Sequence, residues 1–341
     1  MGKHRIGLIG YGNWGENAYA PALKADGRAE VVAVAARSEA THQKVREQLG
    51  KDVALFTSAT DLLNSGNIDG VIVGVPIVTA VDVLKEIFET GIPVMYEPPL
   101  SDVPEDLPDM VSRLRNAEGI TQADLEFRFL PALVRTKELV QEGAIGDVEF
   151  LNVRVRLPGG DPQFPIVEGH PLWDSKMTMG SILGNFAGDM LHELIGRYPQ
   201  RVLLLDGHNC PKRMQWRSLV LYDYGDGIIG QADINHNTTI GGFRFDIDVA
   251  GSNGNIEACT LEGGMDIQIG EGVEPTREEH PPLTPPAGMP GMRECVSAFI
   301  DAVESGTSGP AGAKDSIKIH EIALAIEAAK DSGDWEEVHY G

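Results

Sequence analysis

The sequence is poor in cysteine and in basic residues. Its 341 residues include only three cysteines, and Cys210, Cys259 and Cys295 lack the spacing of a metal site or a C-x-x-C redox motif. Few thiols without a pairing pattern indicate a reducing compartment, so we expect a cytoplasmic protein. Lys and Arg number 28 against 51 Asp and Glu, which gives a formal net charge of −23. Such a surface repels the phosphates of nucleic acids and of anionic lipids, and this excludes both as partners.

Long apolar runs are also missing. No stretch reaches the roughly 18 residues that a membrane-spanning helix needs. The first residues, MGKHRIGLIG, lead straight into a strand pattern without a signal-peptide cleavage site, so we expect no membrane segment. Metal ligands are not clustered either. Asp189, His192 and Glu193 lie on one predicted helix and supply only one side of a site, so the sequence predicts no metal.

What is present in the first part of the chain is a regular alternation of strands and helices. Continuous apolar strands separated by helices predict a parallel sheet covered on both faces, a doubly wound α/β domain over residues 1–122. The expected strands are 5–10, 30–36, 53–56, 70–76, 93–97 and 121–127, and the expected helices are 13–26, 38–50, 81–91 and 101–119.

The character of the chain then changes. Beyond a helix at 129–146, segments with two-residue alternation and Gly or Asn-Gly turns predict a predominantly antiparallel open sheet. We expect a C-terminal α/β domain over residues 123–341, with a terminal helix that stays with it or packs back on the first domain. The expected strands are 148–157, 218–225, 227–237, 243–251 and 254–263, followed by a Pro-rich linker at 278–292 and two closing helices.

A glycine-rich turn follows the first strand directly. It reads G-x-G-x-x-G, with glycines at Gly10, Gly12 and Gly15, and it opens a helix. Gly10 permits the tight turn, Gly12 lets a pyrophosphate approach the backbone, and Gly15 lets helix and strand pack closely. The helix N-terminus then faces the phosphate charge. The pattern predicts a dinucleotide site that includes the intervening residues Asn13 and Trp14.

The end of the second strand indicates which dinucleotide binds. An NAD site usually has Asp or Glu about 20 residues beyond the glycines, and here that position holds Arg37 and Ser38. An arginine and a hydroxyl suit a 2′-phosphate, so NADP(H) is favoured over NAD(H). The alternative is that the two residues only start a solvated helix, with Ser38 as its N-cap.

Several segments together resemble the glucose–fructose oxidoreductase, inositol dehydrogenase and rhizopine-catabolism family (Gfo/Idh/MocA). They are GLIGYGNWGENAYAPAL, GVIVGVP, YEPPL, FRFLPALVRTKELVQEGAIGDV, AGSNGNIEA and AFIDAVESG. The resemblance implies a Rossmann domain that holds NAD(P), with Pro76 and Glu97 on the cofactor side. It also implies a second domain whose open sheet serves a small-molecule substrate and often the contacts of a homo-oligomer, a dimer or tetramer.

The active-site motifs of that family are altered here. Members carry Glu-Lys-Pro after the fifth strand, with the lysine contacting substrate and nicotinamide, whereas this chain has Glu97, Pro98 and Pro99. Members also carry an Asp followed four residues later by a catalytic His. Aligned on residues 180–194, these two positions become Asn185 and Asp189. Both principal catalytic groups are therefore replaced, and the proton donor must be non-standard.

Candidates for that proton transfer come from two segments. Asn185, Asp189 and His192 lie near one helical face, and an Asp189–His192 pair could pass a proton with the histidine titrating near neutrality. The alternative is that His192 faces solvent or caps a neighbouring element. Tyr96, before Glu97, is either a phenol that donates a proton or a packing residue beside the nicotinamide.

Candidates for substrate contact follow from the resemblance. The segment GHPLWDSK (169–176) matches the region from which members reach their substrate. It makes Trp173 a substrate candidate and Lys176 a catalytic candidate that would restore the lost positive charge, with a plain surface lysine as the alternative. Glu126 and Arg128 align with substrate-side positions, as does Asn185.

Together these features predict an NAD(P)-dependent oxidoreductase. It would transfer a hydride between nicotinamide and a hydroxyl or carbonyl group (sugar or polyol-like) or an imine. A second interpretation is a degenerate member that binds the nucleotide without chemistry, as a sensor or scaffold. A third is a redox-assisted lyase or glycosidase with tightly held NAD, a use that favours an acidic ribose-binding residue.

Overall fold

The computed structural model divides the chain into two compact units. It describes residues 2–158, 175–206, 217–238, 244–259, 263–280 and 291–341. Unit 1 consists of Met1–Glu126 and Thr284–Ile317, and unit 2 of Phe127–Leu283 and Lys318–Gly341. The first boundary therefore follows residue 126 where the sequence predicted 122, and a stretch near the C-terminus returns to the first unit.

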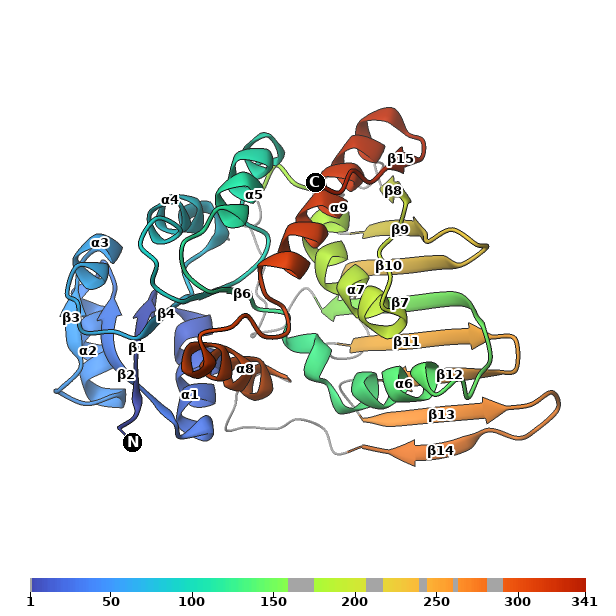
Figure 1. The fold of residues 1–341 in the computed structure, drawn as a ribbon, viewed down its shortest axis with the longest axis horizontal. Helices are drawn as coiled ribbons and strands as arrows, with labels where there is room; N and C mark the ends of the chain where they lie inside the picture. The colour runs from blue at the N-terminus through green and yellow to red at the C-terminus, as the bar shows by residue number, and fades with distance from the viewer. Residues whose placement is uncertain (1, 159–174, 207–216, 239–243, 260–262, 281–290) are drawn as a thin grey trace. The chain divides into compact units, whose positions relative to one another are not determined.

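Unit 1 contains a six-stranded parallel sheet in the order β3-β2-β1-β4-β5-β6 (Figure 1). The central strands are apolar and buried on both faces, as the continuous hydrophobic runs predict. The chain works outward from β1 to β3 and then returns to β4 on the other side of β1. Since crossovers are right-handed, this reversal places helices on both faces, which confirms the doubly wound fold. The strands are β1 (His4–Ile9), β2 (Ala29–Ala35), β3 (Ala54–Phe56), β4 (Gly70–Val73), β5 (Val94–Tyr96) and β6 (Thr121–Ala123).

The helices of unit 1 differ from the sequence prediction at several ends. The helix after β4 begins at Ile77, directly behind Pro76, and not at residue 81. The last strand ends at Ala123, where a strand to residue 127 was expected, because the chain turns into a 3-10 helix that buries Glu126. The helices are η1 (Gly15–Tyr19), α1 (Ala20–Asp26), α2 (Glu39–Gln48), α3 (Ala59–Leu63), α4 (Ile77–Ile87), η2 (Pro104–Asp106), α5 (Leu107–Arg115), η3 (Glu126–Phe129, ending in unit 2) and α8 (Met292–Ser305).

The described strands of unit 2 form a nine-stranded sheet in the order β14-β13-β12-β11-β7-β10-β9-β8-β15. All neighbours are antiparallel except β7 and β10, which run parallel, so the prediction of a predominantly antiparallel sheet is confirmed. The sequence patterns did not reveal β8, β13 and β14. The strands are β7 (Val148–Pro158), β8 (Arg201–Asp206), β9 (Arg217–Asp223), β10 (Ile229–Thr238), β11 (Arg244–Gly251), β12 (Gly254–Cys259), β13 (Gly264–Ile269), β14 (Thr276–Glu279) and β15 (Glu336–Glu337).

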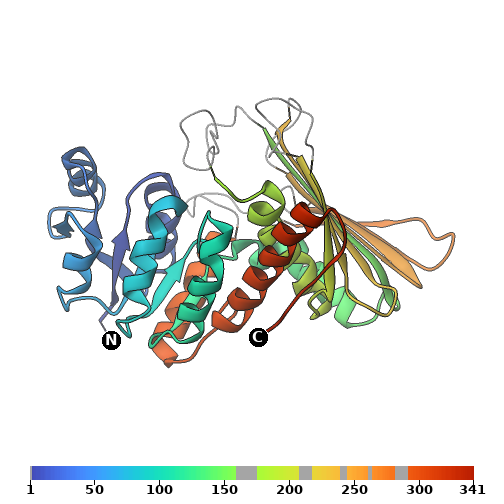
Figure 2. The same cartoon turned by 90° about the horizontal axis from the view of Figure 1, so that it is seen from above.

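One face of this sheet is covered by helices. Alternate residues such as Leu151, Val153 and Val155 are fully buried, and α6 (Pro131–Gln141) and α7 (Met179–Ile195) both contact the strands. Figure 2 shows α7 lying along the sheet. The side chain of Thr178 caps α7 at its start and Gly196 ends it in the left-handed conformation. The last helix, α9 (Ala313–Ser332), begins in unit 1 and continues in unit 2.

Candidate active site

The glycine turn of unit 1 has the geometry that its spacing predicts. Gly10 has a φ of +94°, and a Cβ there would lie 2.7 Å from the carbonyl oxygen of Gly74. A Cβ on Gly15 would lie 2.6 Å from the Gly10 carbonyl oxygen, so the helix can approach the strand only through glycine. A Cβ on Gly12 would meet nothing within 4 Å. The two outer glycines are therefore required by the fold, whereas Gly12 keeps open the space that a pyrophosphate would enter.

The helix behind this turn is tied to α2. The Tyr11 hydroxyl donates to Gln48 at 2.9 Å, the Gln48 amide donates to Glu16 at 2.8 Å, and the Lys44 ammonium donates to Glu16 at 2.7 Å. Burial and the nearby Glu16 raise the pKa of Tyr11 to about 12, so its hydroxyl stays protonated. This chain of bonds fixes the orientation of the loop segment between Gly10 and Gly12.

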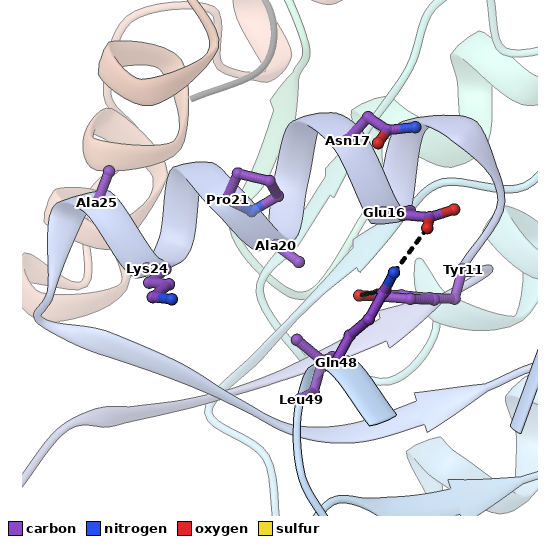
Figure 3. Close-up of a pocket in the computed structure, with 9 residues that line it drawn as sticks. All are labelled: Tyr11, Glu16, Asn17, Ala20, Pro21, Lys24, Ala25, Gln48 and Leu49. Atoms are coloured by element: carbon purple, nitrogen blue, oxygen red, sulfur yellow. Dashed lines mark hydrogen bonds between the residues drawn. The ribbon is translucent and has the colours of Figure 1, made fainter. Parts of the chain in front are cut away.

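A pocket of about 540 Å³ lies beside this network. Figure 3 shows side chains of α1 facing the C-terminal end of α2 across it. Its lining residues are Tyr11, Glu16, Asn17, Ala20, Pro21, Lys24, Ala25, Gln48 and Leu49. None of them follows β4 or β5, the strands whose carboxyl ends border the switch point of the sheet, so we do not place the nicotinamide in it.

The other predicted nucleotide residues are accessible. Asn13 and Arg37 are exposed, and Trp14 is half-buried. Asn13 accepts a hydrogen bond from Asn17 at 2.8 Å. Ser38 caps α2, since its hydroxyl oxygen accepts from the backbone N–H of Thr41 at 3.1 Å. The helix-cap alternative is therefore present in the structure, while the guanidinium of Arg37 points to no hydrogen-bond partner among the described residues.

The carboxyl ends of β4 and β5 present very different side chains. Pro76 is exposed and starts α4. Tyr96 is fully buried: its hydroxyl lies 2.6 Å from the Ser316 hydroxyl and its ring meets Phe88 edge-on. Burial raises the pKa of Tyr96, so this phenol remains protonated within the core of unit 1. Its surroundings favour the packing role over the proton-donor role.

Glu97, the next residue, belongs to a cluster of acids that we call the carboxylate cluster. Its members are Glu97, Asp124 and Glu126, joined by the Tyr19 hydroxyl, which lies 2.9 Å from Asp124 Oδ2 and 3.3 Å from Glu97 Oε2. The Cys295 thiol donates to Asp124 Oδ1 at 3.4 Å. Tyr19, Asp124 and Glu126 are buried, and Glu97 is only partly buried. Glu97 is thus the member that reaches the surface at the sheet edge.

The cluster favours protonated carboxyl groups. Burial and then the Asp124 charge raise the pKa of Glu97 well above its ordinary value. Burial, followed by the charges of Asp124 and Glu97, raises the pKa of Glu126 in the same way. Burial also raises the pKa of Asp124, to about 6, against the opposing effect of hydrogen bonds from Tyr19 and Cys295. No cationic side chain among the described residues forms an ion pair with these acids to offset this.

Unit 2 holds the predicted residues of α7. Asp189 receives two hydrogen bonds from Arg128, Nε to Oδ2 at 2.7 Å and Nη2 to Oδ1 at 2.6 Å, and both residues are buried. Arg128 Nη1 lies 3.5 Å from Glu193 Oε2, and Lys137 pairs with Glu193 on the outside. This bidentate pair keeps Asp189 charged and occupied, which suits a positioning role.

His192 is a correction to the sequence analysis. It is buried, with Nδ1 2.8 Å from the Tyr224 hydroxyl and with the rings of Tyr198 and Tyr222 around it. Burial, and secondarily the charge of Arg128, lowers its pKa to about 3. This lowered pKa disfavours titration near neutrality, and the alternative in which His192 faces solvent is wrong because the residue is buried. Asp189 and His192 do not form a pair, because each contacts a different neighbour of α7. Asp189 binds Arg128, whereas His192 lies against Tyr224.

The remaining predicted residues of unit 2 divide into three cases. Asn185 is buried, and neither its amide nitrogen nor its carbonyl oxygen has a hydrogen-bond partner among the described residues. Such an amide is costly unless a ligand or water satisfies it. Lys176 is exposed, three residues before α7. Trp173 lies outside the described residues.

The sequence patterns do not reveal Asp124 of the carboxylate cluster or Tyr19, which joins its members. Tyr19 is four residues beyond Gly15, inside the segment that the sequence predicts as a helix. Asp124 follows β6 directly, at the sheet edge where ligands bind in open parallel sheets. That position was a usable signal for Asp124. Nothing in the sequence pairs either residue with Glu97.

Known proteins match this chain in sequence. Residues 4–124 match the GFO_IDH_MocA family model, described as an oxidoreductase family with an NAD-binding Rossmann fold. The rhizopine catabolism protein MocA of Rhizobium meliloti is 25% identical over 152 residues, so the chain spans about half the length of that relative, 47% of it. Inositol 2-dehydrogenase of the same species (strain 1021) is 23% identical over 98% of both chains. Residues 4–124 therefore resemble the Gfo/Idh/MocA oxidoreductases, the family to which the motifs point.

A solved structure extends the likeness over the whole fold. Levoglucosan dehydrogenase, in complex with NADH and levoglucosan, superposes with a TM-score of 0.83 at 16% identity, covering 99% of this chain and 100% of that one. At this identity the comparison concerns the fold: a Rossmann domain followed by an open, mostly antiparallel sheet. Both units of the present chain therefore have counterparts there.

The described residues offer neither a membrane-spanning helix nor a metal cluster. None of the helices within the described ranges is long and apolar enough to cross a membrane. Over the same part of the chain, no group of three or more His, Cys, Asp or Glu is arranged to hold a metal ion.

Proposed function

We propose that this protein is an NAD(P)-dependent oxidoreductase that interconverts a hydroxyl and a carbonyl, or an amine and an imine, on a small polar substrate. The observation that carries the proposal is the glycine turn. Its outer glycines are required by the fold, its middle glycine leaves open space, and it lies on the same sheet edge as Glu97.

The residues of unit 1 fit a dinucleotide. Gly12 and the turn around it would hold the pyrophosphate against backbone N–H groups, with Asn13 and Trp14 beside it. Pro76 and Glu97, after β4 and β5, would border the nicotinamide ribose and ring. The bound nicotinamide would supply or accept the hydride. The chain itself must bind the substrate, exclude water and move one proton.

We further propose that NADP(H) is preferred over NAD(H). The support is an exposed arginine, Arg37, at the end of β2, beside the hydroxyl of Ser38 and without a carboxylate at the usual ribose position. Replacement of Arg37 by glutamine should weaken the binding of NADPH by about tenfold and leave the affinity for NADH nearly unchanged. The reason is that one charge-assisted hydrogen bond to a phosphate contributes roughly 1.5–3 kcal/mol. Equal losses for both nucleotides in fluorescence titrations would argue against the preference.

For the substrate we propose a sugar or polyol-like alcohol or its carbonyl. The names of two similar proteins support such a substrate. One is an inositol 2-dehydrogenase, and the other is a levoglucosan dehydrogenase solved in complex with NADH and levoglucosan. In unit 2 the unsatisfied amide of Asn185 offers both a donor and an acceptor for hydroxyl groups, and the Arg128–Asp189 pair would hold α7 in place beside it. Trp173 and Lys176 remain candidates from the segment before α7.

The decisive experiment is purification of the full chain followed by titration with NADPH and NADH and a panel of sugars, polyols, keto sugars and imines. Turnover seen as a change in reduced-nicotinamide absorbance supports the oxidoreductase. Nucleotide binding without turnover on the whole panel would overturn it in favour of a nucleotide-binding sensor. Loss of binding altogether would overturn both.

We propose that the open sheet of unit 2 joins subunits of a homo-oligomer. We also propose that the protein works in a reducing cytoplasm. Exposed apolar residues occur on its strands: Leu205 is 53% exposed, Ile269 44% and Phe150 37%. Replacement of Leu205 by aspartate should lower the mass measured by light scattering if this face joins subunits. A monomeric wild-type chain would refute the proposal.

A further inference from the structure

The Tyr19 hydroxyl is shared by two acids, and this limits their protonation. It lies within hydrogen-bond distance of Asp124 Oδ2 and Glu97 Oε2, at 2.9 and 3.3 Å. A phenol carries one proton and can donate to only one acceptor. For both contacts to be hydrogen bonds, the other carboxyl must be protonated and must donate to the phenol oxygen. The geometry therefore calls for a proton on Glu97 or Asp124.

The same reasoning applies one step deeper. The side chains of Asp124 and Glu126 are hydrogen-bonded to each other, and two carboxyl groups can bond only when one of them is protonated. The proton fits Glu126, because its Oε2 is buried without a hydrogen-bond partner among the described residues and the bond to Asp124 raises the pKa of Glu126.

The fold makes room for this arrangement around Tyr19. Tyr19 ends the π-helical turn η1 that follows the glycine loop, a type of turn that often occurs at functional sites. Its ring lies against Gly74, where an added Cβ would come within 3.1 Å of the ring. The ring thus passes behind the end of β4, and its hydroxyl arrives between the segments that follow β5 and β6. A larger residue at position 74 would push against the Tyr19 ring.

We propose that Glu97 is the proton donor and acceptor of the reaction, and that Tyr19, Asp124 and Glu126 form the relay that restores its proton. The inference rests on the proposed oxidoreductase function and assigns the group that replaces the missing lysine and histidine. Glu97 is the only partly buried member of the cluster and follows the strand at whose end a ligand binds.

The relay can return to its starting protonation state after each reaction. When a carbonyl is reduced, its carbon gains the hydride and its oxygen takes the proton from the Glu97 carboxyl. The Glu97 carboxylate then takes the proton of the Tyr19 hydroxyl, while the phenol oxygen receives a proton that Glu126 passes through Asp124. Solvent returns one proton to Glu126, which restores the starting state. Oxidation of an alcohol runs the same transfers in reverse.

The titratable groups that face the centre of this relay all belong to unit 1. They are Tyr19 from η1, Glu97 after β5, Asp124 after β6, Glu126 from η3 and Cys295 from α8. Burial raises the pKa of Tyr19 and of Cys295 well above their ordinary values, with the neighbouring carboxylates adding to the effect. Both groups are protonated at rest, so Tyr19 can pass its proton to Glu97 only as it receives another from the acids.

The first test does not depend on activity. Infrared spectra of the full chain at pH near 7 should show the carbonyl stretch of a protonated carboxylic acid, shifted in heavy water. The band should weaken in Glu126→Gln and move in Tyr19→Phe, but persist unchanged in Tyr222→Phe. Tyr222 is the matched control, since it is a fully buried tyrosine whose hydroxyl donates to the carbonyl oxygen of Gly184 at 3.2 Å in unit 2. Absence of a protonated-acid band from the wild-type spectrum would overturn the relay.

The second test is kinetic. Glu97→Gln should lower kcat by about 10²-fold or more and Tyr19→Phe by about tenfold, within the usual range for general acid–base groups, with the alkaline limb of the pH profile for carbonyl reduction displaced. Tyr222→Phe should leave kcat and the profile unchanged, and the Kd of the nucleotide for Tyr19→Phe should stay within about twofold of wild type. Turnover that survives in both Glu97→Gln and Tyr19→Phe overturns the relay alone. A wild-type chain without turnover overturns the proposed function itself.

Discussion

Arg128 binds both carboxylate oxygens of Asp189, with Nε–Oδ2 at 2.7 Å and Nη2–Oδ1 at 2.6 Å. The two residues come from η3 and α7 and are almost fully buried. A carboxylate held in this way stays charged and has little freedom to accept a proton from a substrate. The residue that aligns with the family histidine therefore has the surroundings of a structural ion pair.

Removal of one partner of this pair should be costly. For Asp189→Ala we expect a loss of about 3 kcal/mol or more in the free energy of unfolding, because it leaves a buried guanidinium without its main acceptor. The measurement is urea unfolding at 25 °C. Glu193→Gln is the control, since Glu193 is 24% exposed and pairs at the surface, where a loss below about 1 kcal/mol is expected. Equal losses for the two variants would refute the buried-pair interpretation.

The glycine turn predicts a separation between folding and binding. Gly12→Ala should leave the free energy of unfolding within about 0.5 kcal/mol of wild type, because its Cβ enters open space. The same variant should weaken nucleotide binding at least tenfold. Gly10→Ala should instead destabilise the chain by about 1–3 kcal/mol, since it forces a side chain into positive φ against Gly74. Thermal unfolding and fluorescence titration check both variants, and full nucleotide affinity in Gly12→Ala would contradict the assignment of the phosphate loop.

The carboxylate cluster predicts a pH dependence of stability. The pKa of Asp124 is raised from 3.8 to about 6 in the folded chain. A raised carboxyl pKa adds stability that is complete below the unfolded value and is lost as the pH rises through the folded value. The contribution of Asp124 to the free energy of unfolding should therefore fall between about pH 4 and pH 7. Urea unfolding at a series of pH values measures this effect. In Asp124→Asn the fall in the free energy of unfolding between about pH 4 and pH 7 should disappear.

Asp69 provides a contrast of opposite sign. Its hydrogen bond from Arg5 lowers its pKa below 3.8, so its contribution is present above that value and is lost as the pH falls through the folded value. The variant Asp69→Asn should flatten the acid side of the stability profile only. If Asp124→Asn and Asp69→Asn change the profile in the same direction, the proposed environment of the cluster is wrong.

His192 should remain neutral across the physiological range. Its pKa is lowered from 6.5 to about 3, so its contribution to stability is present above the unfolded value and disappears as the pH falls toward 3. The ring nitrogens, followed by nuclear magnetic resonance and assigned with a His192→Gln variant, should show no titration between about pH 5 and 8. A midpoint near 6.5 would restore the proton-transfer role that the sequence suggested.

Local sequence signals were sufficient for the strands of unit 1, the glycine turn and the resemblance of residues 4–124 to the family model. These features depend on short patterns: apolar runs of strand length, and glycines whose spacing has a steric reason. The weaker predictions concerned boundaries and strands without a strong pattern. The chain TQADLEF alternates like a strand, yet its second half forms a 3-10 turn that carries Glu126 inward. β8, β13 and β14 have too little alternation for their length to be recognised.

The sequence by itself determined the type of domain and the position of the nucleotide turn, because each is a property of a few neighbouring residues. Only the tertiary structure decided which side chains act together. Tyr19 meets Asp124 across 105 residues, and Arg128 meets Asp189 across 61. The strength of such contacts depends on burial and on the choice of partner, which no local pattern specifies. For this reason we propose the carboxylates at the edge of the Rossmann sheet, and not residues of α7, as the groups that transfer the proton.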